Sequence, residues 1–137
     1  MAHVAMKEQE FEHDPLVLNE IDRQELAEHI TNVFSAWRLP TIDQALLLGL
    51  STNGRSTLNR YAKGHPVAQS RDLIWRIGHI LAVYEILHAS DLDAPERADM
   101  WPTKPNERLG GKRPIDFMRT PDGLAATRSW LEVTGAW

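Results

Sequence analysis

The side chains that most often carry catalysis or bind metals are scattered along this chain of 137 residues. The chain has no cysteine, so it has no thiol nucleophile and no Cys-ligated zinc. Its six histidines lie at His3, His13, His29, His65, His79 and His88. No two of them show the H-E-x-x-H spacing that places a zinc site on one helix face, and no serine lies in a nucleophile elbow. We therefore expect no enzyme, no metal and no cofactor.

The basic and polar side chains in residues 38–71 give a clearer indication of a chemical role. This stretch has five basic residues against one acidic residue, Asp43, whereas residues 1–37 have two basic and eight acidic residues. A local excess of positive charge attracts polyanions, although it is also common on an ordinary solvated surface. The side chains here that could reach phosphates and base edges are Arg55, Ser56, Asn59, Arg60 and Lys63.

The element that would position these side chains is a helix-turn-helix. Apolar residues at three- and four-residue steps predict a helix over 21–37, which Pro40 stops. Thr41 and Gln44 form a capping-box pattern that predicts a short second helix, ended by Gly49.

A third helix is predicted from residue 53 to residue 62, with Leu58 facing inward. A purely structural role for these short helices stays open. Thr52-Asn53-Gly54 would weaken the third helix where base contacts usually form, because glycine disfavours helix.

The second half of the chain predicts a helical core. Ser70 caps a helix over residues 71–88 whose broad apolar face indicates a central position. Pro95 and Pro114 suit the first turns of two short helices, and Thr120 precedes the last one. No segment reads as a strand, so the predicted fold class is all-α.

Apolar side chains beside the main stripe of the central helix suggest self-association. Ile74, Trp75 and Ile86, together with Trp37, exceed what one small bundle comfortably buries. A two-fold interface would cover the excess, so we expect a homodimer.

The stretch "PNERLGGKRPIDFM", residues 105–118, is an irregular and charged turn between apolar segments. Asparagine side chains mimic a backbone turn, and glycine permits positive φ and close backbone approach. We expect a rigid turn fixed by Pro105, Asn106, Gly110, Gly111 and Pro114. The alternative is a plain turn with solvated basic side chains.

Several motifs, taken in order, resemble the Xre/MbcA/ParS-type antitoxins of RES-domain toxin–antitoxin pairs. They are "ALLLGLS", "RDLIWRIGHILAVYEILH", "MWPTKPNERLGGKRPIDFM" and "GLAATRSWLE". The resemblance covers roughly residues 23–134. It implies an all-helical fold, with an N-terminal Xre-like helix-turn-helix region followed by a small helical toxin-binding domain.

The resemblance also implies a function. The chain would be a non-catalytic antitoxin that binds its cognate RES-domain toxin and covers the toxin's NAD pocket. That toxin would be ADP-ribosyltransferase-like or NAD-degrading, and the complex would repress its own promoter. The expected toxin-binding residues are Arg108, Lys112, Arg113, Arg119, Arg128, Trp130 and Trp137. The basic residues would meet carboxylates of the partner, and Trp137 would plug a pocket.

The predicted organisation has three parts. Residues 1–20 form a flexible acidic arm, residues 21–69 the helix-turn-helix-like region, and residues 70–137 the toxin-binding and dimerisation region. With no cysteine and no apolar run long enough to cross a bilayer, we expect a cytoplasmic protein with no membrane partner. The alternative function is a DNA-binding regulator of the Xre class without a toxin partner, in which case operator DNA is the main ligand.

Overall fold

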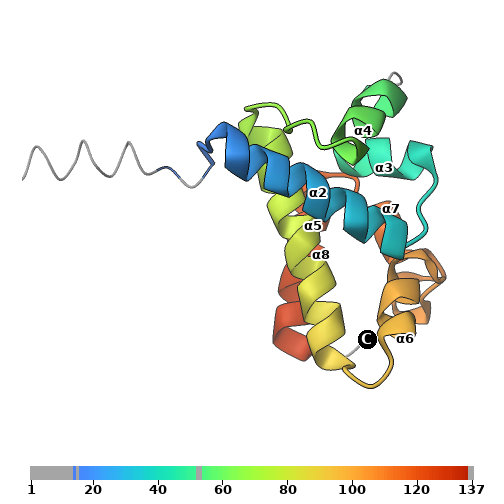
Figure 1. The fold of residues 1–137 in the computed structure, drawn as a ribbon. Helices are drawn as coiled ribbons and strands as arrows, with labels where there is room; N and C mark the ends of the chain where they lie inside the picture. Colours follow the sequence, from blue (N-terminus) through green and yellow to red (C-terminus); the bar gives the residue numbers. More distant parts are fainter. Residues whose placement is uncertain (1–13, 15, 52–53, 136–137) are drawn as a thin grey trace, which may run out of the picture.

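In the computed structural model, residues 14, 16–51 and 54–135 are described, and they form helices joined by short turns (Figure 1). The α-helices are α2 (Glu20–Ala36), α3 (Thr41–Leu47), α4 (Gly54–Ala62), α5 (Arg71–Ser90), α6 (Pro95–Met100), α7 (Pro114–Phe117) and α8 (Pro121–Thr134). Two 3₁₀ turns follow α6: η1 (Trp101–Thr103) and η2 (Glu107–Leu109). No strand occurs in these ranges, so the predicted all-α class is confirmed.

Local capping signals define several helix starts. The Asn19 side chain accepts from the backbone N–H of Asp22 at 2.8 Å and caps α2. Ser70 caps α5 in the same way, as predicted, by accepting from Leu73 N, and Thr120 caps α8 by accepting from Gly123 N. These caps satisfy N–H groups that the first turn of a helix leaves without partners.

The capping box predicted at the start of α3 is wrong. Pro40 occupies the N-cap position, so Thr41 is already helical and makes no capping hydrogen bond. The Gln44 side chain instead donates to the carbonyl oxygen of Leu39 at 2.8 Å. Proline provides no side-chain acceptor, and the Gln44 side chain ties α3 to the turn that precedes it.

Helix α5 is the centre of the core. Its residues Ile77, Ile80, Val83 and Leu87 are fully buried, because α2, α6 and α8 all pack against it. Figure 1 shows α8 lying alongside α5, with α2 crossing the upper half of the bundle and α3 and α4 at one end. Ile115, Met118, Leu124 and Leu131 complete the buried cluster from the C-terminal side.

Two of the apolar residues that were expected to need a two-fold interface are buried within the single chain. Trp37 is 2% exposed and Ile74 is 4% exposed, so neither needs a second copy to cover it. Trp75 and Ile86 pack only partly against the core. The apolar excess from which a homodimer was predicted is thus smaller than the sequence indicated.

Most of the predicted acidic arm lies outside the described residues, but its last residues contact the core. Leu16 and Leu18 are partly buried against the hydrophobic cluster. The Gln69 side chain accepts from the Leu18 N–H at 3.2 Å and donates to the Leu16 carbonyl at 2.9 Å. Arg71 also pairs with Asp14. This short segment is held beside the start of α5.

Candidate functional site

The turn of residues 105–114 is built by Asn106 and two glycines. The Asn106 side chain accepts from the Arg108 N–H at 2.9 Å, and its backbone bridges to Lys112 in antiparallel fashion, with Asn106 N donating to Lys112 O at 3.0 Å. Gly110 and Gly111 have φ of 68° and 83°, a region that side chains with Cβ rarely adopt. The turn is therefore closed by hydrogen bonds that depend on these residue types.

An aromatic groove of about 330 Å³ opens beside this turn. The indole rings of Trp101 and Trp130 stack with centroids 6.4 Å apart and planes 13° apart. The Arg108 guanidinium carbon lies 5.9 Å from the centre of the Trp130 ring, within reach of a cation–π interaction. The full lining is Trp101, Asn106, Arg108, Leu109, Pro114, Phe117, Gly123, Ala126, Thr127 and Trp130.

Close approach of α7 and α8 shapes the groove. A Cβ at Gly123 would lie 1.8 Å from the carbonyl oxygen of Phe117, so only glycine fits there. Pro114 is buried at the start of α7, whereas Pro105 is exposed. Phe117 stays 38% exposed, and it therefore presents an aromatic edge at the groove. An open apolar groove of this kind is typical of a site for another molecule.

Two of the predicted toxin-binding cations are engaged inside the chain. Arg113 Nη2 and Arg119 Nη2 each lie 3.0 Å from Asp116 Oδ1. They also reach Asp43, which is 7% exposed, at 4.0 Å and 3.4 Å respectively. The Arg113 guanidinium is therefore already paired within the chain, and its contact with a toxin stays a prediction.

This ion-pair cluster joins α3 to the α7–α8 segment. Hydrogen bonding from Arg113 lowers the pKa of Asp116 below its ordinary value, and the same bond raises the pKa of Arg113. Arg76 of α5 adds two hydrogen bonds to backbone oxygens: its Nη1 donates to the carbonyl oxygens of Leu47 at 3.3 Å and Arg119 at 2.8 Å. The N-terminal and C-terminal parts are therefore linked by charge as well as by the core.

The other predicted toxin-binding residues outside the groove differ in whether they already have a partner within the chain. Arg128 Nε pairs with Glu132 at 2.8 Å, and its Nη1 lies 3.3 Å from Nδ1 of His79. Burial, and then the nearby Arg128 charge, lower the pKa of His79. Lys112 is exposed. Trp137 lies outside the described residues.

Helix α4 presents the predicted DNA-binding residues on one face. Arg55, Ser56, Asn59, Arg60 and the following Lys63 are all exposed, while Leu58 and Tyr61 are buried. Ser51 lies at the turn before α4, whereas Thr52 and Asn53 fall outside the described residues. Gly54 begins the helix and is buried against Ala45 and Leu50 of the preceding segment, so a Cβ there would come within 2.9 Å of the Ala45 methyl.

Sequence reasoning missed six of the groove residues, among them Trp101, Leu109 and Phe117, and one ion-pair partner. Trp101, Leu109 and Phe117 line the groove but were not among the expected contacts. A signal for Phe117 was present, because it lies between the apolar residues Ile115 and Met118 in the sequence. Asp43 had a signal as well, as the single acid in a basic stretch.

Within the described residues, no group of three or more acidic, histidine or cysteine side chains could hold a metal ion. In the same ranges, no helix is both long and apolar enough to span a bilayer.

Residues 82–132 match the family model of the antitoxin Xre/MbcA/ParS C-terminal toxin-binding domain. The matched segment holds the turn, the aromatic groove, the C-terminal part of α5 and most of α8, so the resemblance to this antitoxin family is confirmed there. No curated protein matches the chain in sequence.

Proposed function

We propose, on the premise that residues 82–132 form a toxin-binding domain of the Xre/MbcA/ParS antitoxins, that the protein neutralises a RES-type toxin by binding it through the aromatic groove. The chain acts by binding and not by catalysis. The toxin it covers is ADP-ribosyltransferase-like or NAD-degrading, and the antitoxin blocks the toxin's NAD pocket.

The groove is the observation that carries this proposal. It is lined by stacked tryptophans, an exposed phenylalanine edge and one guanidinium, the residue types that dominate binding hot spots. It lies wholly within the matched toxin-binding segment. With Arg113, Arg119 and Arg128 paired inside the chain, apolar contact contributes more to toxin binding than the cations do.

Co-expression with the protein encoded next to this chain tests the proposal. Size-exclusion chromatography would detect a stable complex, and an NAD-consumption assay would follow the toxin's activity. Neutralisation predicts a complex in which NAD turnover is suppressed. A neighbour that stays separate, with NAD turnover unchanged by this chain, would rule out the antitoxin function.

A second candidate function is DNA binding by α4, which would serve autorepression or a regulator without a toxin. It is supported by the exposed row of Arg55, Ser56, Asn59, Arg60 and Lys63, none of which has a side-chain ion pair with another described residue. Useful affinity would need a homodimer that reads two half-sites about one turn of DNA apart. Binding to promoter DNA that weakens steeply with salt would support this function. A monomer at micromolar concentration in light scattering would count against it.

A further inference from the structure

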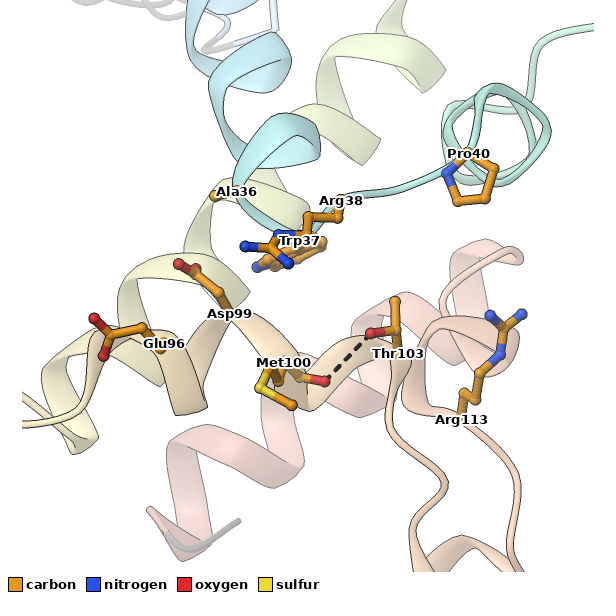
Figure 2. Close-up of a pocket in the computed structure, with 9 residues that line it drawn as sticks. All are labelled: Ala36, Trp37, Arg38, Pro40, Glu96, Asp99, Met100, Thr103 and Arg113. Carbon is orange, nitrogen blue, oxygen red and sulfur yellow. Dashed lines mark hydrogen bonds between the residues drawn. The ribbon is translucent and has the colours of Figure 1, made fainter.

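A second cleft, of about 380 Å³, lies where the end of α2 meets α6 and η1 (Figure 2). It is distinct from the aromatic groove, with which it shares no lining residue. Trp37, Pro40 and Met100 supply apolar surface, and Met100 is 60% exposed. In the view of Figure 2 the Arg38 side chain overlaps Trp37, with Glu96 toward one end of the cleft and Arg113 at the other.

The backbone of Arg38 has a conformation that is unfavourable for a residue with a Cβ. Arg38 has φ of 55° and is the one non-glycine with positive φ among residues 14, 16–51 and 54–135. It terminates α2 with the hydrogen-bond pattern of a Schellman motif: Arg38 N donates to Ser35 O at 3.0 Å and Leu39 N to Phe34 O at 3.1 Å. Glycine is strongly favoured at this position, since it has no Cβ. The arginine therefore lowers stability, which suggests that its side chain has a use.

The Arg38 guanidinium in the cleft has no partner among the described residues. Within the described part of the chain, the Arg38 guanidinium makes no ion pair and no side-chain hydrogen bond, and the buried indole N–H of Trp37 has no acceptor. Of the two acids beside them, Asp99 is occupied by His88 at 2.7 Å. An occupant that accepts hydrogen bonds and carries negative charge would pair with the exposed Arg38 guanidinium.

We propose that this cleft is a second contact site for the protein partner and receives one of its acidic side chains, with Arg38 as the charged contact. The inference rests on the proposed antitoxin function. Arg38 and Pro40 come from the N-terminal part, whereas Met100, Thr103 and Arg113 belong to the matched toxin-binding segment. A toxin seated here would therefore touch both parts of the chain, and the unpaired Glu96 would exclude a carboxylate from the opposite end.

The test is Arg38→Gly, measured for thermal stability and for affinity to the toxin. Relief of the strained backbone predicts a melting temperature higher by a few degrees. Loss of a charge-assisted hydrogen bond predicts toxin binding weakened about tenfold or more. Arg38→Asn keeps a residue type that tolerates positive φ but removes the charge, and it should lose the same affinity. Arg71→Ala is the matched control, because it removes one exposed positive charge at the start of α5, outside the cleft lining.

The outcomes separate this inference from the function beneath it. Weaker binding by both Arg38 variants, with Arg71→Ala unchanged, supports the cleft as a contact. If Arg38→Gly stabilises the chain and binds the toxin as tightly as the wild type, the second contact does not exist, although the antitoxin function stands. If the wild type itself does not bind the toxin, the proposed function fails, and the inference fails with it.

Discussion

The basic face of α4 and the aromatic groove differ in whether the cations on and around them form ion pairs within the chain. On α4, Arg55, Arg60 and Lys63 project into solvent without a side-chain ion pair in the described residues. Around the groove, Arg113 and Arg119 are tied to Asp116 and Asp43. The first surface suits a flexible polyanion whose charge matters more than its shape. The second suits a partner that fits an apolar shape, since Arg113 and Arg119 are already paired within the chain.

The largest expected effect comes from Gly123→Ala. The new Cβ would meet the Phe117 carbonyl oxygen at 1.8 Å, so α7 and α8 must separate and the groove must change shape. We expect unfolding to become easier by about 3 kcal/mol, with toxin binding lost. Thermal melts followed by circular dichroism would measure it. Gly78→Ala is the control, because nothing lies within 4 Å of its Cβ and alanine favours the interior of α5.

Trp130→Ala should break the groove while leaving the basic face intact. It removes the ring that stacks on Trp101 and lies under Arg108. Truncation of a hot-spot tryptophan costs on the order of 2 kcal/mol or more of binding free energy, so toxin affinity should fall about thirtyfold or more. Calorimetric titration would measure it, with the 86% exposed Val133→Ala as the control. Equal affinities of the two variants would exclude the groove as the contact.

Asp43→Asn probes the link between the two surfaces. The substitution leaves Arg113 and Arg119 with Asp116 alone and keeps a buried polar group in place. A lost charge-assisted hydrogen bond predicts a loss of stability of about 1–3 kcal/mol. Urea unfolding would measure the change, and the exposed Asp93→Asn should behave as the wild type. An unchanged midpoint would mean that the cluster adds nothing to the connection between the parts.

Lys63→Ala sharpens the comparison from the other side. If Lys63 contacts a phosphate, DNA affinity should fall for every sequence and the slope of log affinity against log salt should become shallower by about 1. Toxin affinity should not change. Fluorescence anisotropy with promoter DNA at several salt concentrations would show the slope. A wild-type protein with no salt-dependent DNA binding would remove this function from the basic face.

The smallest expected effect is a pH dependence from His79. Burial and the Arg128 charge lower its pKa in the folded state below the ordinary 6.5. The folded protein therefore binds this proton less readily than the unfolded chain. The contribution of neutral His79 to the free energy of unfolding should be fully present above about pH 6.5, and it should decline as the pH falls toward the lowered pKa of the folded state. His79→Gln should flatten this decline in denaturant midpoints between pH 7.5 and 5. The exposed His29→Gln should leave it unchanged.

The sequence predicted the elements whose signals are local. Ser70 and Thr120 act through N–H groups three residues away, so both caps were predictable. The sequence could not reveal that Asp43 meets Arg119, because 76 residues separate them and only the packing of α3 on the C-terminal segment brings them together. Trp101 and Phe117 were visible as apolar residues, but their shared groove depends on the close approach that Gly123 permits.

Titrating the toxin's NAD turnover with the wild-type chain, Trp130→Ala and Lys63→Ala tests the central claim most directly. The account predicts that the wild type and Lys63→Ala suppress turnover at equal concentrations, while Trp130→Ala requires a much higher concentration. Equal suppression by all three proteins would contradict the assignment of toxin binding to the aromatic groove. Suppression by none of them would contradict the antitoxin function itself.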